Sequence, residues 1–204
     1  MSKVFDPSVG EIKNLNLYKN KNIPFMRKIL KNSISNRQKT EIEISKIIMK
    51  NPQKNIVKIY EIKLPDNMND GYIDMELLVP LEDDKEYKIN KIHKTQFHKI
   101  DNNILSGLNQ LHKLYIIYID LHIGNVGWSA INKCWKIFDF NMSGIVNNNN
   151  IYQWKYIPDN GIIFRKIINF KKYNEIFNNN NNKITYDVIA KMLFDRELKT
   201  IINK

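Results

Sequence analysis

Two acidic residues and one asparagine, each set among apolar residues, are the side chains of this sequence best suited to chemistry. Asn125 follows Asp120 by five residues, and Asp139 comes after a further apolar stretch. One carboxylate can orient an attacking hydroxyl and accept its proton, while the carboxamide and the other carboxylate can hold magnesium against the phosphates of a nucleotide. The residue types and their order therefore predict a phosphoryl-transfer site.

Either acidic residue alone is weak evidence for such a site. Asp120 could be a loop residue after a buried strand, and Asp139 could be a turn former at a strand end. The combination is more specific, because Asp139 follows two predicted strands, Val126–Trp128 and Cys134–Phe138, at the separation that such a site requires. We therefore interpret the two acidic residues and Asn125 as parts of one site.

The two segments resemble the catalytic loop and the metal-binding motif of protein kinases. They read Y-I-D-L-H-I-G-N (118–125) and D-F-N (139–141), where the family has H-R-D-x-x-x-x-N and D-F-G. The loop is most similar to the D-L-H-W-G-N-V of haspin-type kinases, and aminoglycoside and choline kinases share D-L-H-x-x-N. The resemblance implies an α+β, two-lobed kinase-like fold that uses ATP and Mg²⁺, and it leaves open whether the acceptor is a protein or a small molecule.

The composition is that of an ordinary soluble globular protein, with 43% hydrophobic and 26% charged residues in a chain of 204. No apolar run approaches membrane-spanning length, and the N-terminal segment lacks the apolar core of a signal peptide. The single cysteine, Cys134, cannot form an internal disulfide, so we expect a reducing compartment such as the cytoplasm.

The formal net charge of +11 does not by itself predict a nucleic-acid partner, because no block of five basic residues occurs. Lysine, asparagine and isoleucine are all abundant, as AT-rich coding would produce, which suggests a large DNA virus or an AT-rich eukaryote as the source. Runs of asparagine at 147–150 and 178–182 are expected to be exposed loops.

Four elements are predicted before the catalytic loop. Apolar spacing predicts an amphipathic helix over Ser35–Lys50, and a second helix over Asp101–Leu114 leads into the loop. Strands are predicted over 55–62 and 72–79, separated by the turn-rich segment 65–71. The kinase resemblance implies a small β-rich lobe over residues 1–79 and a reduced, mainly helical lobe over residues 80–204.

The resemblance also carries over to the phosphate-binding lysine. The segment P-F-M-R-K (24–28) resembles the family's V-A-I-K, which implies that Lys28 grips the α and β phosphates. A buried ammonium needs a carboxylate to stay charged and aimed. Glu43 is the expected partner by alignment, with Glu41 as the alternative on another face of the helix.

The nucleotide-binding residues are implied by the same alignment. Gly10 and Ile12 match the end of an otherwise degenerate glycine-rich loop, and Asp187 matches an aspartate that braces the catalytic loop. Tyr118, Phe140 and Ile47 would form a stacked apolar spine. The adenine pocket would have Met26 in its roof, Gly127 in its floor, Met75 as gatekeeper, and the backbone of Glu76 and Leu78 as hydrogen-bonding partners of adenine.

Several positions depart from the family. Ile119 replaces the arginine that usually binds a phosphorylated activation loop, so we expect no control of that kind. Asn141 replaces the glycine of D-F-G, and we expect the turn to survive because asparagine tolerates left-handed backbone. The expected activity is transfer to Ser or Thr of a protein, with a further partner protein completing the reduced lobe. A pseudokinase scaffold and a small-molecule kinase remain alternatives.

Overall fold

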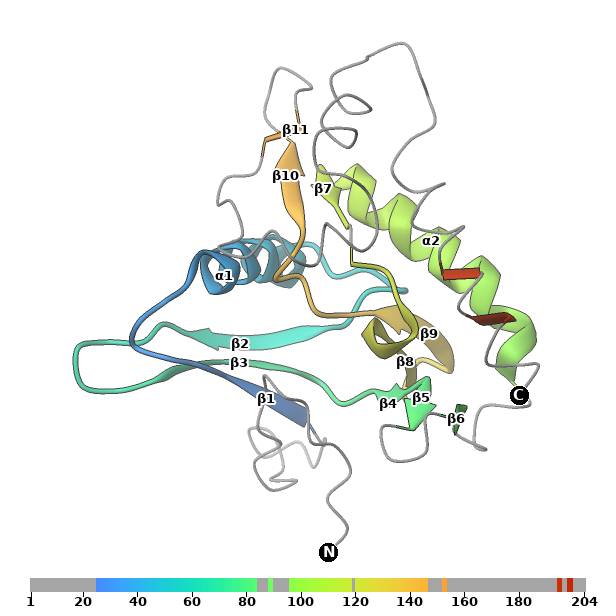
Figure 1. Ribbon diagram of the computed structural model, residues 1–204, viewed down its shortest axis with the longest axis horizontal. Coiled ribbons are helices and arrows are strands. Elements are labelled where there is room, and N and C mark those ends of the chain that lie inside the picture. The colour runs from blue at the N-terminus through green and yellow to red at the C-terminus, as the bar shows by residue number, and fades with distance from the viewer. Residues whose placement is uncertain are drawn as a thin grey trace, which may run out of the picture.

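The structure, a computed structural model, describes residues 25–83, 88–89, 96–118, 120–146, 152–153, 194–195 and 198–199. These residues form an α+β arrangement of two main helices and four small antiparallel sheets (Figure 1). The α+β class expected from the sequence is therefore confirmed, while the lobe boundary at residues 79 and 80 stays a prediction. Gly10, Ile12 and Asp187 lie outside the described residues, as do Ile119 and both asparagine runs.

The first sheet has the strand order β1-β3-β2, and helix α1 (Asn36–Lys50) packs against it. Its strands are β1 (Phe25–Leu30), β2 (Ile59–Lys63) and β3 (Gly71–Glu76). Because side chains alternate along a strand, Lys28 shares one face of β1 with the buried Leu30, and its register partner on β3 is Ile73.

Helix α1 begins where the sequence supplies a capping box. The Ser35 hydroxyl accepts a hydrogen bond from the backbone N–H of Gln38, and the Gln38 side chain accepts one from the backbone N–H of Ser35. These two bonds satisfy N–H groups that would otherwise lack partners at the helix start. The cap fixes where the helix begins, and therefore which of its side chains face β1.

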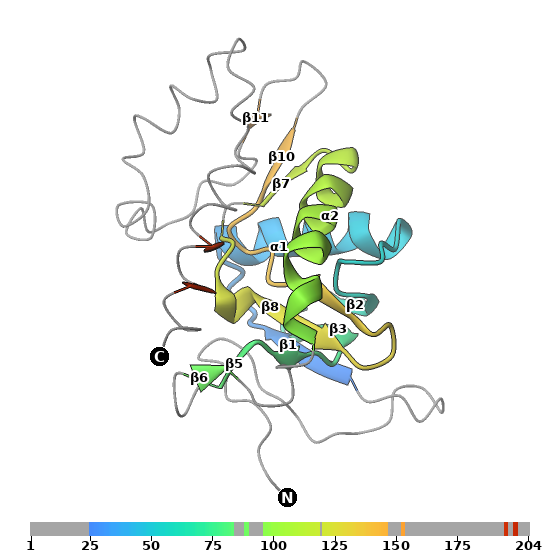
Figure 2. The same ribbon diagram turned by 90° about the vertical axis from the view of Figure 1, so that its right-hand side faces the viewer.

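The second sheet, β4-β8-β9, carries the candidate site at its edge. Its strands are β4 (Val79–Pro80), β8 (Val126–Ser129) and β9 (Cys134–Ile137), and helix α2 (Ile100–Lys113) packs against β9 (Figure 2). A parallel bridge between Ile56 and Ile137 joins the segment after α1 to β9. The two sheets thus meet along one continuous apolar core.

The remaining strands are short. They are β5 (Glu82–Asp83) paired with β6 (Lys88–Ile89), and β10 (Gly144–Val146) between β7 (Ile116–Ile117) and β11 (Tyr152–Gln153). Strand β7 precedes Asp120 in the chain, and β10 follows the D-F-N segment. Their pairing therefore brings the chain before Asp120 next to the chain after Asp139.

The largest fully buried side chain of the core, Trp135, belongs to the second sheet. Trp135 is fully buried and contacts Trp128 edge to face, with ring centroids 5.4 Å apart. Its indole N–H donates to the carbonyl of Gln96, so the polar end of the ring also has a hydrogen-bond partner.

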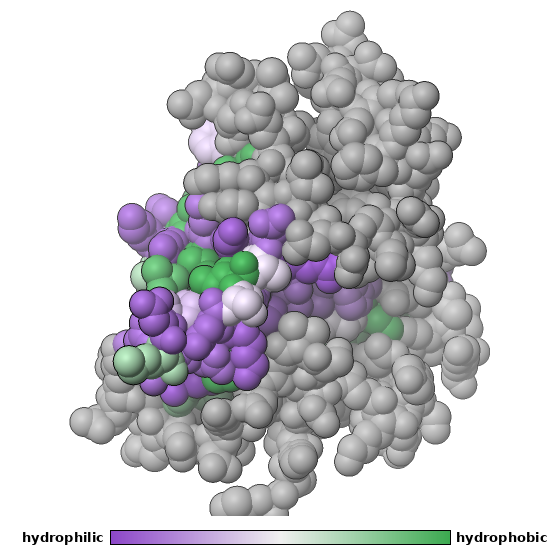
Figure 3. All heavy atoms as spheres, turned by 60° about the vertical axis from the view of Figure 1, so that its left-hand side comes forward, coloured by the Kyte–Doolittle hydropathy of each residue, from purple (hydrophilic) through white to green (hydrophobic). Residues whose placement is uncertain are grey.

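The face in Figure 3 shows a small apolar area surrounded by hydrophilic residues. Within the described residues, no helix is long and apolar enough to cross a membrane.

The predicted elements match the observed ones with small shifts. The two helices begin and end within one residue of the expected positions. The predicted strand over 55–62 begins later, at Ile59, since Ile56 makes only an isolated bridge. The predicted strand over 72–79 ends at Glu76, before the two residues that connect it to β4.

Candidate active site

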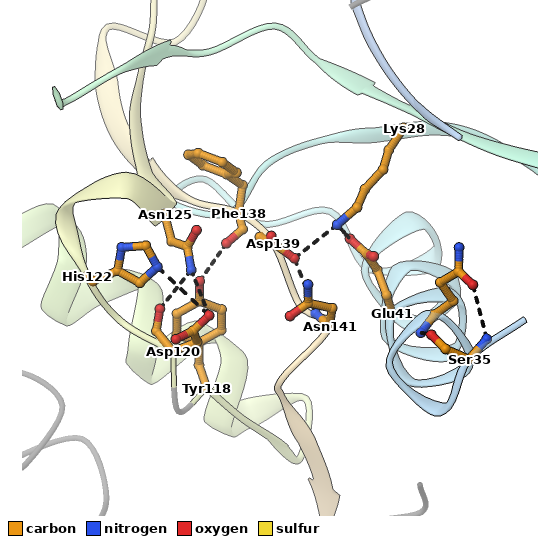
Figure 4. A network of polar contacts seen from close by, with 11 residues as sticks. Lys28, Ser35, Glu41, Tyr118, Asp120, His122, Asn125, Phe138, Asp139 and Asn141 are labelled. Atoms are coloured by element: carbon orange, nitrogen blue, oxygen red, sulfur yellow. Dashed lines mark hydrogen bonds and ion pairs between the residues drawn. The ribbon is translucent and has the colours of Figure 1, made fainter. Parts of the chain in front are cut away.

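Three charged groups from distant parts of the chain meet between the two sheets. The ammonium of Lys28 on β1 lies 2.8 Å from Glu41 Oε1 on α1 and 3.1 Å from Asp139 Oδ1 after β9 (Figure 4). The side chains of Lys28 and Glu41 are almost completely buried, whereas that of Asp139 is a quarter exposed. The cluster is therefore open to solvent only on its Asp139 side.

The partner of Lys28 is Glu41, so the prediction of Glu43 is wrong and the alternative is right. Residues two apart on an α-helix lie about 200° apart around its axis, so the two carboxylates cannot both face β1. Glu41 shares a buried stripe with Ile44, Ser45 and Ile48, at the spacings i, i+3, i+4 and i+7. That periodicity was present in the sequence and was a better guide than the alignment.

Burial and ion pairing act together on the charged groups of the cluster. Burial opposes the charge on Lys28, but the nearby carboxylates of Glu41 and Asp139 outweigh it and raise the lysine pKa. Burial raises the pKa of Glu41 to about 7, against the opposing attraction of Lys28. Glu41 Oε2 is buried and has no hydrogen-bond partner among the described residues. One ammonium thus contacts two carboxyl groups, of which that of Glu41 binds a proton more readily than usual.

The segment from Asp120 to Asn125 is held by a hydrogen-bonded pair. Asn125 donates from Nδ2 to the backbone carbonyl of Asp120 at 2.9 Å and to its Oδ2 at 3.2 Å. The loop turns through a 3-10 helix, η2 (Ile123–Asn125), directly before β8. Asn125 points its amide nitrogen at Asp120 and its oxygen away from it (Figure 4). Burial raises the pKa of Asp120, although the nearby His122 opposes this shift.

Strand pairing brings Asn125 close to the segment that carries Asp139. The backbone N–H of Phe138 donates to the carbonyl of Asn125 at 3.1 Å, next to the β8–β9 ladder. The turn between these strands needs only a few residues, so the two halves of the site are adjacent in space although 14 residues apart in sequence (139 − 125). The pairing explains why an apolar strand pair precedes Asp139.

The backbone of Asp139 adopts the left-handed conformation, with φ of 60°. This conformation is uncommon for residues other than glycine. The turn that was expected to survive at Asn141 is present, since the backbone N–H of Ser143 donates to the Phe140 carbonyl at 3.0 Å, but Asn141 is not among the residues with positive φ. The Asn141 N–H instead donates to Asp139 Oδ1 at 3.4 Å. The unusual backbone thus belongs to the candidate metal ligand itself.

Tyr118 supports the segment that carries Asp139. Its hydroxyl donates to the Phe138 carbonyl at 2.5 Å, and its ring meets Phe140 edge to face at 5.8 Å. Both rings are buried. Ile47 is partly buried against the same core. The predicted contact between Tyr118 and Phe140 is therefore present, and the tyrosine adds a hydrogen bond that was not predicted.

The residues present fit a magnesium ion bound together with phosphate. Among the described residues, no group of three or more His, Cys, Asp or Glu side chains could hold a metal on its own. Mg²⁺ is usually bound through one or two carboxylates, with water and substrate phosphates completing its shell. Asp139 and Asn125 supply hard oxygen donors of this kind.

The residues expected around adenine fall into two contacting pairs. Met75 is buried on β3 opposite Met26 on β1. Gly127 on β8 lies against Leu78, because a Cβ built at Gly127 would come within 2.7 Å of the Leu78 Cβ. The backbone N–H of Glu76 donates to the Lys58 carbonyl at 2.8 Å, so this N–H is used within the fold.

One buried ion pair beside this region was missed. Lys136 on β9 lies 2.7 Å from Glu76, and Ser129 donates to the other oxygen of the same carboxylate. The available signal was a lone lysine in the apolar segment Cys134–Phe138. A charged residue in a strand buried on both faces needs a counter-ion, but the sequence does not show where that partner lies.

A solved viral kinase structure resembles part of this chain. No family model matches the sequence, and no curated protein sequence matches it. Among solved structures, the Cydia pomonella granulovirus kinase PK-1 matches with 25% sequence identity and a TM-score of 0.46. The match covers 63% of this chain and 46% of that one, so this chain spans less than half the length of that kinase.

Proposed function

We propose that this chain has a two-lobed kinase-like fold and transfers the terminal phosphoryl group of ATP to serine or threonine hydroxyls of a protein, with magnesium as cofactor. The observation that carries the proposal is the meeting of Lys28, Glu41 and Asp139 next to the Asp120–Asn125 pair. These residues come from four separate segments of the chain. Their convergence supports the role that the kinase resemblance implies.

Each side chain has a distinct role in this proposal. Lys28 binds the α and β phosphates through an ammonium that Glu41 keeps in place. Asp139 and Asn125 Oδ1 hold magnesium, which when bound neutralises charge on the phosphates. The pocket beyond Lys28 would place adenine between Met26 and Gly127, near Met75, with the backbone of Glu76 and Leu78 as its polar partners.

Asp120 would act on the acceptor. Its carboxylate orients the hydroxyl and takes its proton as the new O–P bond forms and the bond from phosphorus to the β-phosphate oxygen breaks, releasing ADP. Asn125 holds Asp120 in place through its amide group, so the same asparagine would connect the proton acceptor to the metal. The positions of these groups support transfer to a hydroxyl, and the choice of a protein acceptor rests on the sequence resemblance.

The test is a radiolabelled-ATP assay with mixed protein and small-molecule acceptors, together with a direct measurement of magnesium–ATP binding. Asp139→Asn should abolish magnesium-dependent binding. Asp120→Asn should keep binding and lower turnover by orders of magnitude. Asp70→Asn is the matched control, because this exposed carboxylate precedes β3 and pairs with the exposed Lys31, beyond the end of the β1–β3 ladder.

Three outcomes would contradict the proposal. Equal magnesium–ATP affinity in the wild type and in Asp139→Asn would show that the metal assignment is wrong. Nucleotide binding without transfer to any acceptor would favour a pseudokinase scaffold. Label on small molecules alone would favour a small-molecule kinase.

A further inference from the structure

His122 stands two residues after the proposed catalytic Asp120, and the roles assigned above do not use it. Its Nδ1 accepts a hydrogen bond from the backbone N–H of Gly124 at 3.1 Å. Its Nε2 lies 3.8 Å from Asp120 Oδ2. Both ends of the ring therefore face defined partners. Nδ1 faces the backbone of η2, and Nε2 faces the Asp120 carboxylate (Figure 4).

The Gly124 hydrogen bond sets the tautomer of the ring. A neutral imidazole has one nitrogen that donates and one that accepts, and the hydrogen bond made by one nitrogen determines the state of the other. Because Nδ1 accepts from Gly124, the proton is on Nε2. The ring then directs an N–H dipole at the Asp120 carboxylate, at a distance longer than a hydrogen bond but short enough for electrostatic attraction.

The surrounding backbone keeps the ring in this position. A Cβ at Gly124 would lie 2.8 Å from His122 Cε1 and 3.0 Å from Nδ1, so any larger residue there would push the ring. The backbone carbonyl of His122 accepts from the N–H of Asn125 at 3.0 Å. The same oxygen of Asp120 that faces His122, Oδ2, also accepts from Asn125 Nδ2. Asp120 is thus held between two groups of the same short turn.

We infer that His122 is a positioning residue, whose ring, fixed by the Gly124 hydrogen bond, holds the Asp120 carboxylate in the orientation needed to meet the acceptor hydroxyl. The inference deepens the proposed function and rests on it for the role of Asp120. The histidine side chain is 44% exposed, whereas that of Asp120 is 17% exposed, so the ring stands on the solvent side of the carboxylate. The ring therefore restricts movement of the Asp120 carboxylate toward solvent, and it does so from outside the core.

Two conservative variants separate positioning from a purely structural role. In His122→Asn the side-chain oxygen replaces Nδ1 and can still accept from Gly124, but no group reaches Asp120. In His122→Gln the amide nitrogen replaces Nε2 and can still donate toward Asp120, but the acceptor for Gly124 is lost. Asparagine should therefore preserve stability better, and glutamine should preserve turnover better.

The experiment measures kcat, the KM for ATP and the melting temperature of wild type, His122→Ala, His122→Gln and His122→Asn. We expect His122→Ala to lower kcat about tenfold or more, as general-base positioning commonly does, with an unchanged KM for ATP. His122→Gln should recover most of the lost kcat, and His122→Asn should recover little of it. If kcat instead follows the melting temperature across the variants, or if His122→Ala turns over like wild type, the inference is wrong.

A second measurement does not depend on turnover. Nitrogen-15 NMR of the histidine rings, assigned by the signal missing in His122→Gln, should show His122 with its proton on Nε2. A proton on Nδ1 would overturn the inference. A wild-type protein with the Nε2–H tautomer and no phosphoryl transfer to any acceptor would overturn the proposed function while supporting this placement of His122.

Discussion

The ammonium of Lys136 on β9 lies 2.7 Å from the carboxylate of Glu76 at the end of β3, and both side chains are at least 97% buried. Ser129 donates to the other carboxylate oxygen, and the backbone N–H of Lys58 lies 3.4 Å from Glu76 Oε2. The pair joins the β1-β3-β2 sheet to the β4-β8-β9 sheet. It lies three residues before Asp139, so it also anchors the strand that carries the candidate metal ligand.

Removing one partner of this ion pair should destabilise the folded protein strongly. Lys136→Met should lower the free energy of unfolding by about 3–5 kcal/mol, because the Glu76 carboxylate would stay buried without a counter-ion. Urea unfolding measures the change. Lys31→Met is the matched control, since the exposed Lys31–Asp70 pair should contribute no more than about 1 kcal/mol.

The double variant Lys136→Met, Glu76→Gln tests the cause of that loss. It should recover part of the stability, because it removes the buried charge together with its partner. If the two substitutions destabilise the protein additively, the ion pair is not the reason for the loss.

The sequence predicted the elements better than it predicted the contacts between them. Helices α1 and α2 were found because each has an apolar face at helical spacing, which depends on local residues only. The partner of Lys28 was assigned by alignment, and an error of two residues moved it to the wrong side of the helix. The Lys136–Glu76 contact spans 60 residues, and nothing local to either residue identifies the other.

In the candidate site, too, the positions of residues were easier to predict than their contacts. Asp120, Asn125 and Asp139 were identified from their spacing, since loops that follow strands place residues predictably. The left-handed backbone at Asp139 was not predicted, because it depends on how the Phe138 carbonyl is held by Tyr118. The role proposed for His122 likewise depends on where its two ring nitrogens point, which a sequence motif does not specify.

Glu41 and Glu43 form a matched pair for testing the nucleotide site. Glu41→Gln should weaken magnesium–ATP binding about tenfold, because Lys28 would keep only Asp139 as a charged partner and move toward it. Glu43→Gln should leave the affinity close to that of wild type. Equal losses in both variants, measured by titration calorimetry, would show that the contact with Glu41 is not the one that positions Lys28.

Glu41 should also make stability depend on pH. Burial raises its pKa from 4.5 in the unfolded chain to about 7 in the folded protein, so the folded state binds the proton more tightly. The free energy of unfolding should therefore fall as pH rises from 4.5 to 7, by about 1–3 kcal/mol from this group. The pKa of Lys28 is raised from 10.5, so its titration lies above this window.

The pH dependence is tested by comparing wild type with Glu41→Gln in urea unfolding at several pH values. Burial also raises the pKa of Asp120, so only the difference between the two proteins reports on Glu41. The variant should have a flatter profile between pH 4.5 and 7. A profile parallel to that of wild type would mean that Glu41 ionises at its ordinary pKa.

Tyr118→Phe should separate the hydrogen bond of this residue from its packing. The ring contact with Phe140 would remain, but the Phe138 carbonyl would lose its hydroxyl partner in a buried place. We expect a stability loss of about 1–2 kcal/mol. Magnesium–ATP affinity should fall as well, because the adjacent left-handed Asp139 would be held less firmly. A loss of stability with unchanged affinity would show that Tyr118 does not support Asp139.

Gly127 should be intolerant of even a methyl group. A Cβ there would lie 2.7 Å from the Leu78 Cβ and 3.3 Å from the Val79 carbonyl oxygen, and neither atom is the end of a flexible side chain. Gly127→Ala should therefore displace the segment 77–79 and cost about 1–3 kcal/mol of stability. Since the backbone of Leu78 is proposed to bind adenine, ATP affinity should fall as well.

Gly107→Ala is the control for this substitution. Gly107 lies in the middle of α2, where its Cβ would meet the movable Ile137 side chain and the Asn55 carbonyl oxygen, each at 3.0 Å. Alanine stabilises a helix interior by about 1 kcal/mol relative to glycine, and this gain offsets part of the cost of crowding. Its ATP affinity should match that of wild type. If Gly127→Ala binds ATP as tightly as Gly107→Ala does, the segment after β3 does not form part of the nucleotide site.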